Sequence, residues 1–396
     1  MGEIMKIKKQ FLKAIFYSVF FTFKIFFLHA ELISSDVFNY SIDFPEGFSI
    51  ADCSQDERAV LFEHTLLPVQ TAIRVWPKSD FKSSEACLSS TLKKISGIGE
   101  ITSLKWRNQD CALSQISIPE NILGTSMSGW ATCIPLPQKE EYLCILCYAP
   151  KDKAYDCEQF ILSTLDSIMI DRGSFRESGI VTQFAYPRTK KMEITLEISG
   201  TKIKTAMDKD DAEANQFVVD REFAVFSIFA SEKSWKEAWQ RFYRMIAKDS
   251  MGRTKRIAFD ISSALYAKAM DDAQVSQALL TWTQNFNYER KSASADKADF
   301  TNIPAVILGS GSDCDSRSML LMVLFKNMNL DSCMFISVEY SHAMAGIVLD
   351  KKQGQYFELD GKHYLTGETT AKNLTWGLMP ADMQDRSKWI PVELYD

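Results

Sequence analysis

The chain has 396 residues, of which 46% are apolar and 24% are charged. This length and composition exclude a wholly disordered, collagen-like or coiled-coil chain and predict two or three domains, each large enough to bury a core. The formal net charge is −6, but residues 1–30 carry five lysines and one glutamate, so the remainder carries −10. A body that acidic is not expected to bind the phosphate backbone of a nucleic acid.

The first thirty residues have the pattern of an export signal. Four lysines within residues 6–13 precede an apolar run over residues 14–28. A basic region followed by a short apolar region is typical of a secretory signal peptide. Because Lys24 interrupts the run and Leu28 is large for a cleavage site, an uncleaved membrane anchor is the alternative. We expect a signal peptide over residues 1–30 and a periplasmic or secreted protein, held at the inner membrane only if the segment is retained.

Residues 31–171 are expected to form an α+β sandwich domain. Period-two alternation of apolar residues predicts the strands, and helical spacing predicts two helices. The strands are expected at residues 38–44, 59–64, 71–76, 112–118, 129–135 and 141–148, and the helices at 83–95 and 157–168. Strands around a helix in this order favour an α+β sandwich. The rhythm of residues 40–50 and the helix near 160–170 resemble PsbP-like sandwich domains.

Residues 172–230 and 231–396 are expected to form two further domains. The first is predicted to be a small β module, with strands at residues 179–186, 192–198, 216–219 and 223–229 and a solvated charged loop at 208–213. The second begins with an amphipathic helix with an aromatic face over residues 235–246. Further helices are expected near residues 254–270 and 271–286. The fold class is therefore multi-domain α+β.

Most of the nine cysteines are expected to have a structural role. Seven lie in the first domain, an odd number that cannot all pair with one another as disulfides. Cys144 and Cys147 match the C-x-x-C spacing, but in a strand their thiols point to opposite faces of the sheet. Redox pairs and zinc sites normally use a turn or a helix N-terminus instead. We expect no metal and no cofactor.

Cys314 differs from the other cysteines in its surroundings. It lies in a glycine- and serine-rich segment, residues 309–317, directly before a run with helical apolar spacing. Ser312 and Asp315 have the spacing of a capping box, which predicts Ser312 as the N-cap and Cys314 in the first helical turn. Unpaired backbone N–H groups and the helix dipole favour a thiolate there. An ordinary cysteine in a helix cap is the alternative.

Histidines are scarce, and this limits the partners that a nucleophilic cysteine could use. Without the signal segment only His64, His342 and His363 remain, and His64 lies in the first domain. His342 opens a buried-looking strand, whereas His363 lies in an alternating run after a turn. The sequence contains no H-E-x-x-H, G-x-S-x-G or phosphate-loop motif, so a metalloenzyme, a serine hydrolase of that type or a nucleotide-binding enzyme is not expected.

Five motifs between residues 271 and 396 resemble the bacterial transglutaminase-like superfamily, which includes transglutaminase-like cysteine peptidases. They follow one another in the family's order. The motifs are Leu279-Leu280-x-x-x-Gln284-x-Phe286-x-Tyr288, Ser312-Asp313-Cys314-Asp315-Ser316-Arg317, His342-Ala343-Met344-Ala345, Gly361-Lys362-x-Tyr364-x-x-x-Glu368-Thr369-Thr370 and Trp376-Gly377-Leu378-Met379-Pro380. The resemblance implies a papain-like Cys-His-acid site on an α+β domain.

By position, the resemblance makes Cys314 the nucleophile and His342 the base. Glu368 stands where the family has the aspartate of a D-P-T motif, and it is the favoured acid. Asp360 is the alternative, although Asp360-Gly361 is a hairpin-turn signal that favours a solvated side chain. The backbone N–H of Cys314 is the expected oxyanion donor, and Gln284 is a second candidate. Asp313 and Arg317 are expected to be structural, linking the helix start to a neighbouring segment.

The resemblance implies an exported bacterial enzyme that transfers acyl groups through a thiol. Such an enzyme would cleave or transamidate amide bonds of a protein or peptide substrate. The alternative is a catalytically inactive scaffold or binding protein of the cell envelope that has kept the fold. The substitution of glutamate for aspartate at position 368 supports this second interpretation.

Overall fold

The computed structural model describes residues 32–290, 297–350 and 354–395, and these ranges form a multi-domain α+β protein. The predicted signal segment lies outside the described residues. Among the helices described, none combines the length and hydropathy needed to cross a membrane. The chain divides into two compact units. The N-terminal unit contains the described residues up to Ser174 with 179–184 and 228–238, and the C-terminal unit contains 175–178, 185–227 and the described residues from Trp239 onward.

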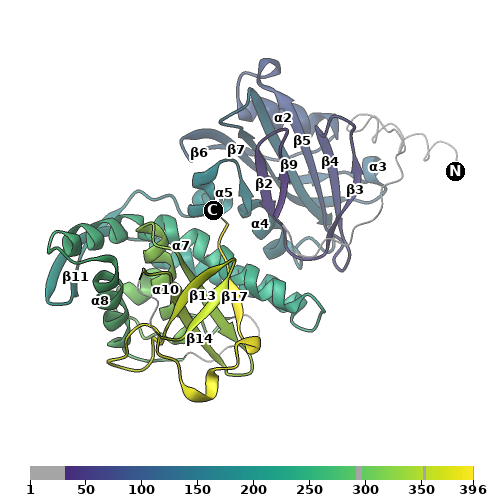
Figure 1. Ribbon diagram of the computed structural model, residues 1–396. Helices are drawn as coiled ribbons and strands as arrows, with labels where there is room; N and C mark the ends of the chain where they lie inside the picture. The colour runs from purple at the N-terminus through teal and green to yellow at the C-terminus, as the bar shows by residue number, and fades with distance from the viewer. Residues whose placement is uncertain (1–31, 291–296, 351–353, 396) are drawn as a thin grey trace. The chain divides into compact units, whose positions relative to one another are not determined.

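A seven-stranded antiparallel sheet forms the centre of the N-terminal unit, with the strand order β3-β4-β5-β9-β8-β7-β6 (Figure 1). Its strands are β3 (Phe48–Cys53), β4 (Ala59–His64), β5 (Gln70–Pro77), β6 (Ile101–Trp106), β7 (Gln109–Ile118), β8 (Met127–Pro135) and β9 (Glu141–Pro150). A smaller sheet contains β1 (Leu32–Ser35), β2 (Tyr40–Asp43) and β10 (Ile168–Met169). The helices are α2 (Ser84–Lys94), α3 (Glu120–Leu123) and α4 (Glu158–Asp166). The strands and helices expected within residues 31–171 are thereby confirmed, with shifts at their ends.

Helices α2 and α4 cover opposite faces of the large sheet. Cys144 and Cys147, three positions apart on β9, point to opposite faces. The Cys144 sulfur contacts Cys87 of α2, whereas the Cys147 sulfur lies beside Thr164 of α4. Both faces of β9 are therefore covered. This explains why eight of its ten residues are buried and why nearly all of these eight are apolar.

The prediction of a small β module over residues 172–230 was wrong. Only one of the four expected strands exists, as β11 (Lys191–Ile198), and it pairs with β12 (Thr201–Asp208). The others lie in the helices α5 (Ile180–Ala185) and α6 (Asp211–Phe229). Short apolar runs do not distinguish a buried helix from a strand, which accounts for the error. The segment is divided between the two units and forms no separate one.

The charged stretch at residues 208–213 is not a solvated loop either. Asp211 is fully buried, and its Oδ1 accepts a hydrogen bond of 2.8 Å from Nη1 of the buried Arg253. Arg253 also binds Asp249, four residues earlier on the same helix, over 2.7 Å. Asp211 of this stretch therefore pairs with a buried guanidinium, which a residue of a solvated loop would not do.

The C-terminal unit packs helices against a five-stranded antiparallel sheet with the order β15-β16-β14-β13-β17 (Figure 1). Its strands are β13 (Ser332–Ser337), β14 (His342–Ile347), β15 (Tyr356–Leu359), β16 (Lys362–Gly367) and β17 (Ile390–Val392). Its longer helices include α7 (Trp235–Tyr266), α8 (Asp272–Gln284) and α10 (Cys314–Asn327), with the short α9 (Ile303–Ile307) before α10. The helices predicted at residues 235–246 and 254–270 are parts of one helix, α7. Short 3-10 turns cover Lys78–Asp80, Arg172–Arg176, Ala381–Met383 and Arg386–Lys388.

Helix α10 is the central helix of this unit. It packs against β13 and β14 on one side and against α8 and α9 on others. Twelve of its fourteen residues are buried, so the rest of the unit covers nearly every face of the helix. Its N-terminus is consequently fixed beside the start of β14.

Candidate active site

Cys314 is the first residue of α10, and Asp313 rather than Ser312 caps the helix. The Asp313 Oδ1 accepts hydrogen bonds from the backbone N–H of Ser316 at 3.0 Å and from the Ser316 hydroxyl at 2.7 Å. Ser312 instead accepts a hydrogen bond of 3.1 Å from Nε of Arg317. The prediction of Ser312 as the N-cap was wrong by one residue, because the aspartate carboxylate is the stronger acceptor at the helix start.

His342 is the first residue of β14, and the structure brings its segment to Cys314. β14 packs against α10, and the backbone N–H of Ala343, the residue after His342, lies within hydrogen-bonding reach of the Cys314 sulfur. The His342 ring is mostly buried, with 12% of its side chain exposed, and Trp389 packs edge to face against it at 6.3 Å between centroids. The imidazole is therefore held at the edge of a dry site.

Glu368 is the carboxylate that pairs with His342. Its Oε2 lies 2.7 Å from His342 Nε2, and only 4% of the glutamate side chain is exposed. Its Oε1 accepts hydrogen bonds from the Thr370 backbone N–H at 2.7 Å and the Thr370 hydroxyl at 2.5 Å. Burial opposes ionisation, but the hydrogen bonds from His342 and Thr370 outweigh it and lower the pKa of Glu368 to about 2. The carboxylate is charged and both of its oxygens are occupied.

Asp360, the alternative acid, lies elsewhere. It occupies the exposed turn between β15 and β16 with a φ of 49°, as the hairpin signal predicts. Glu368 follows the other end of β16, so the strand separates the two carboxylates. The remaining described histidines do not compete for Cys314: His64 is buried in the N-terminal unit, and His363 stacks on Tyr356. The geometry selects Glu368 over Asp360 as the partner of His342.

Arg317 and Gln284 hold the segment that carries Glu368. The Arg317 guanidinium donates to the Thr369 carbonyl at 3.0 Å and to the Phe286 carbonyl at 2.8 Å. Gln284 Nε2 donates to the carbonyls of Glu368 at 2.9 Å and Leu374 at 3.1 Å. Both amide hydrogens of Gln284 are therefore used, so the suggestion that it donates to an oxyanion is wrong in this arrangement. Arg317 has the expected structural role.

The surroundings of Cys314 favour the protonated thiol, contrary to the expectation of a thiolate. Its Sγ donates a hydrogen bond of 3.1 Å to Asp315 Oδ1. Burial first, and the negative charge of Asp315 next, raise the pKa of the Cys314 thiol far above its usual value. The Ala343 N–H acts in the opposite direction and is outweighed. Burial and the adjoining carboxylate therefore oppose the stabilisation of a thiolate by the helix dipole.

Two residues around the thiol were not predicted from the sequence as parts of the site. Asp315 also accepts a hydrogen bond from the Tyr243 hydroxyl of α7, which is fully buried. From the sequence, Asp315 was expected only as part of a capping box, so no signal pointed to its contact with the thiol. Tyr243 comes from the aromatic face of α7, where core packing alone explains an aromatic residue and no signal distinguishes it.

Comparison with known proteins does not identify the chain. No family model and no curated protein matches it. Among solved structures, cyanobacterial PsbP from Synechocystis sp. PCC 6803 has a TM-score of 0.30 and 9% identity, covering 36% of this chain and 94% of its own. The Ran-binding protein Mog1p of Saccharomyces cerevisiae has a TM-score of 0.27 and 9% identity, and the match covers 35% of this chain and 94% of Mog1p. A protein of Bacteroides thetaiotaomicron VPI-5482 has a TM-score of 0.23 and 12% identity, over 61% and 80%.

Proposed function

We propose that the C-terminal unit is a transglutaminase-like thiol acyl-transfer enzyme in which Cys314, His342 and Glu368 form the catalytic triad. Its substrates are amide bonds of a protein or peptide, and the enzyme is exported by its N-terminal segment. The observation that carries the proposal is the buried contact of 2.7 Å between His342 Nε2 and Glu368 Oε2. A carboxylate at Nε2 fixes the tautomer of the ring and leaves Nδ1 as the nitrogen available for proton transfer.

The proposed reaction proceeds through a thioester. His342 removes the Cys314 proton as the sulfur attacks the substrate carbonyl carbon, and the new C–S bond forms a tetrahedral intermediate. The C–N bond then breaks, and His342 transfers the proton to the departing amine. Water or an amine next attacks the thioester carbonyl, again losing its proton through His342, and Cys314 departs as a thiol. Water is the more abundant acceptor, so hydrolysis is the favoured outcome.

The position of Cys314 provides a donor for the oxyanion of that intermediate. As the first residue of α10, Cys314 has a backbone N–H without an acceptor inside the helix. This N–H lies at the positive end of the helix dipole and adjoins the reacting sulfur. The raised thiol pKa means that His342 must deprotonate Cys314 during the attack, as in a serine hydrolase, rather than before substrate binds.

The test is acylation of the chain by an activated ester. The full chain is incubated with the p-nitrophenyl ester of an N-blocked glutamine at neutral pH, and the acylated cysteine is identified by peptide mass spectrometry. We expect the acyl group on Cys314, and we expect Cys314→Ala and His342→Ala to abolish it. Cys53→Ser is the matched control, because Cys53 is an exposed cysteine outside the site. Acylation of Cys53 without acylation of Cys314 would contradict the proposal.

A non-catalytic scaffold is the second candidate function. It is favoured by the hydrogen bond of the Cys314 thiol, which goes to Asp315 and not to His342 within the part of the chain that the structure describes. A thiol held by a buried carboxylate is a poor nucleophile. A scaffold predicts no ester turnover in the wild-type chain and unchanged folding stability of Cys314→Ala, whereas the enzyme predicts a turnover that Cys314→Ala removes.

A further inference from the structure

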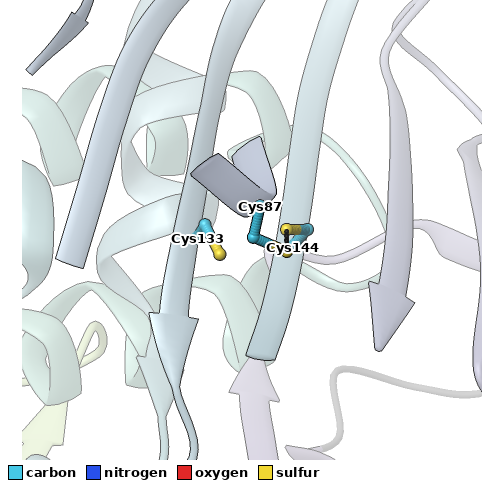
Figure 2. A group of neighbouring side chains, drawn as sticks. All are labelled: Cys87, Cys133 and Cys144. Carbon is cyan, nitrogen blue, oxygen red and sulfur yellow. Dashed lines mark hydrogen bonds between the residues drawn. The ribbon is translucent and has the colours of Figure 1, made fainter. Parts of the chain in front are cut away.

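Three cysteines of the N-terminal unit converge in its core, far along the sequence from the proposed active site. Cys87 comes from α2, Cys133 from β8 and Cys144 from β9 (Figure 2). Their sulfur atoms all lie within 4.8 Å of one another, and the sulfurs of Cys87 and Cys144 are 3.6 Å apart. We call these three residues the cysteine cluster.

The sheet register explains why the three sulfurs meet. Cys133 and Cys144 are directly opposite each other in the antiparallel pairing of β8 and β9, so their side chains point to the same face. Helix α2 covers that face and contributes Cys87 from its first turn. The C-x-x-C pair seen in the sequence is therefore divided: Cys144 joins the cluster, and Cys147 faces the other side.

The cluster is dry and offers sulfur ligands alone. All three cysteines have no solvent-exposed surface. Within the described residues, no histidine, aspartate or glutamate joins the group of potential ligands. The Thr91 hydroxyl approaches the Cys144 sulfur at 3.8 Å, but it donates to the Cys87 carbonyl at 2.8 Å. In the part of the chain that the structure describes, no fourth strong ligand adjoins the three sulfurs.

The three side chains present their sulfur atoms to one small volume of the core. Burial disfavours three thiolates on their own, because a buried charge needs a partner of opposite sign. A cation bound between the sulfurs would supply that partner.

A narrow pocket lies near the cluster, at one edge of α2. It is lined by Trp76, Thr91 and Lys94 among others, and Thr91 is a neighbour of both Cys87 and Cys144. The Lys94 ammonium lies 3.8 Å from the centre of the Trp76 ring at this pocket. Thr91 therefore stands between the pocket and the cluster.

We propose that Cys87, Cys133 and Cys144 are the three ligands of a binding site for a soft monovalent metal ion, and that this ion is Cu⁺. Metal–sulfur bonds of about 2.3 Å in a trigonal plane place the sulfurs about 4 Å apart. The observed separations, 3.6 Å for one pair and within 4.8 Å for all, need only small side-chain adjustments to reach it. Loading releases the protons of the thiols to solvent and forms three copper–thiolate bonds, with no change of oxidation state.

The absence of a fourth ligand separates Cu⁺ from zinc in this site. Structural Zn²⁺ is almost always tetrahedral with four protein ligands, and catalytic Zn²⁺ keeps a water. A dry set of three thiolates satisfies neither requirement. Soft thiolate ligands select Cu⁺, which is stable with three sulfurs and needs no water. A disulfide between Cys87 and Cys144 is the other possible use of the pair and would leave Cys133 alone.

The test measures Cu⁺ binding by the reduced full chain under anaerobic conditions, in competition with bicinchoninate. We expect one Cu⁺ per chain, with three sulfur neighbours at about 2.3 Å by X-ray absorption at the copper edge. Cys87→Ala, Cys133→Ala and Cys144→Ala should each lower the affinity by at least about 100-fold, more than the loss of an outer-sphere partner costs. Cys147→Ala is the matched control, because it removes a buried thiol of the same strand on the opposite face, and it should bind as the wild type does.

The spectroscopic measurement on the wild-type chain does not depend on whether any variant folds. Failure of the wild type to hold Cu⁺ against the competitor would overturn the proposal. A coordination number below three, or an equal loss of binding in Cys147→Ala, would do the same. So would a Cys87–Cys144 disulfide found by peptide mapping of the protein as isolated. None of these results depends on the activity of Cys314.

Discussion

His342 Nε2 and Glu368 Oε2 are 2.7 Å apart, and the second oxygen of the same carboxylate is bound twice by Thr370. Glutamate is one methylene longer than the aspartate of the family's motif. The two hydrogen bonds from Thr370 to Oε1 anchor the longer side chain and direct Oε2 at the imidazole. The substitution that supported an inactive scaffold is therefore compatible with a positioned His–carboxylate pair.

Glu368→Gln should lower kcat for the ester by about 10³–10⁴-fold, the range seen when a triad carboxylate becomes an amide. The amide N–H₂ can donate to His342 Nε2, which would leave the proton on Nδ1 and remove the base that faces the sulfur. The measurement is steady-state release of p-nitrophenol. Asp360→Asn is the matched control, because it neutralises the alternative acid in an exposed turn, and it should leave kcat unchanged. The opposite result would make Asp360 the functional carboxylate.

Acid should remove the contribution of Glu368 to stability. Its pKa falls from 4.5 to about 2 in the folded chain. A depressed carboxyl pKa stabilises the fold above pH 4.5, and that contribution, on the order of 3 kcal/mol, disappears as the pH falls toward 2. In urea unfolding at steps from pH 6 to pH 2, the stability difference between wild type and Glu368→Gln should shrink toward the acid end. A difference that stays constant over this range would show that folding does not lower the pKa of Glu368.

The sequence predicted the helix and strand starts of the candidate site more accurately than the elements of residues 172–230. Each residue of the candidate triad lies at the end of an element that the sequence signals. Cys314 starts the helix α10, His342 starts the strand β14, and Glu368 directly follows the strand β16. Residues 211–229 form α6, whose buried positions include the polar residues Asp211, Asn215 and Glu222. Because these polar residues share the buried face, the apolar residues alone do not show the spacing that distinguishes a helix from a strand. Local patterns therefore marked the candidate site, whereas the buried polar residues concealed the helix.

The cysteine cluster could not be predicted for a different reason. Cys87 and Cys144 are 57 positions apart, and their contact depends on the register of β8 with β9 and on the face that α2 covers. The C-x-x-C spacing directed attention to Cys147 instead, which lies on the other face. Similarly, Asp315 raises the pKa of its neighbour Cys314 only because both are buried. The sequence shows which residues are neighbours along the chain, but it does not show how deeply they are buried, and burial decides the size of the pKa shift.

Asp315→Asn should make Cys314 more reactive toward alkylation. The carboxylate accepts a hydrogen bond from the thiol, and its negative charge adds to the effect of burial in raising the thiol pKa. Removing the charge lowers the pKa of the thiol. Each unit by which this pKa falls raises the thiolate fraction at pH 7 tenfold. We expect at least a tenfold faster reaction of Cys314 with iodoacetamide, measured by peptide mass spectrometry. Asp331→Asn, which removes a carboxylate paired with Lys362 on the same unit, should leave the rate unchanged, and an unchanged rate in Asp315→Asn would mean that the acid does not restrain the thiol.

Gln284→Ala separates a supporting role from a direct part in catalysis. In the structure the side chain donates to the carbonyls of Glu368 and Leu374. Its loss leaves the Glu368 carbonyl without this donor, whereas the Leu374 carbonyl keeps its hydrogen bond from Gln277. We expect a cost of about 1–3 kcal/mol of stability and a looser backbone at Glu368. An oxyanion donor would instead lower kcat by about 10²–10³-fold and leave the fold intact. Gln277→Ala is the control, because Gln277 also donates to Leu374 but does not touch Glu368. If Gln284→Ala melts at the wild-type temperature and loses only kcat, the glutamine acts on the substrate and must turn from these carbonyls during the reaction.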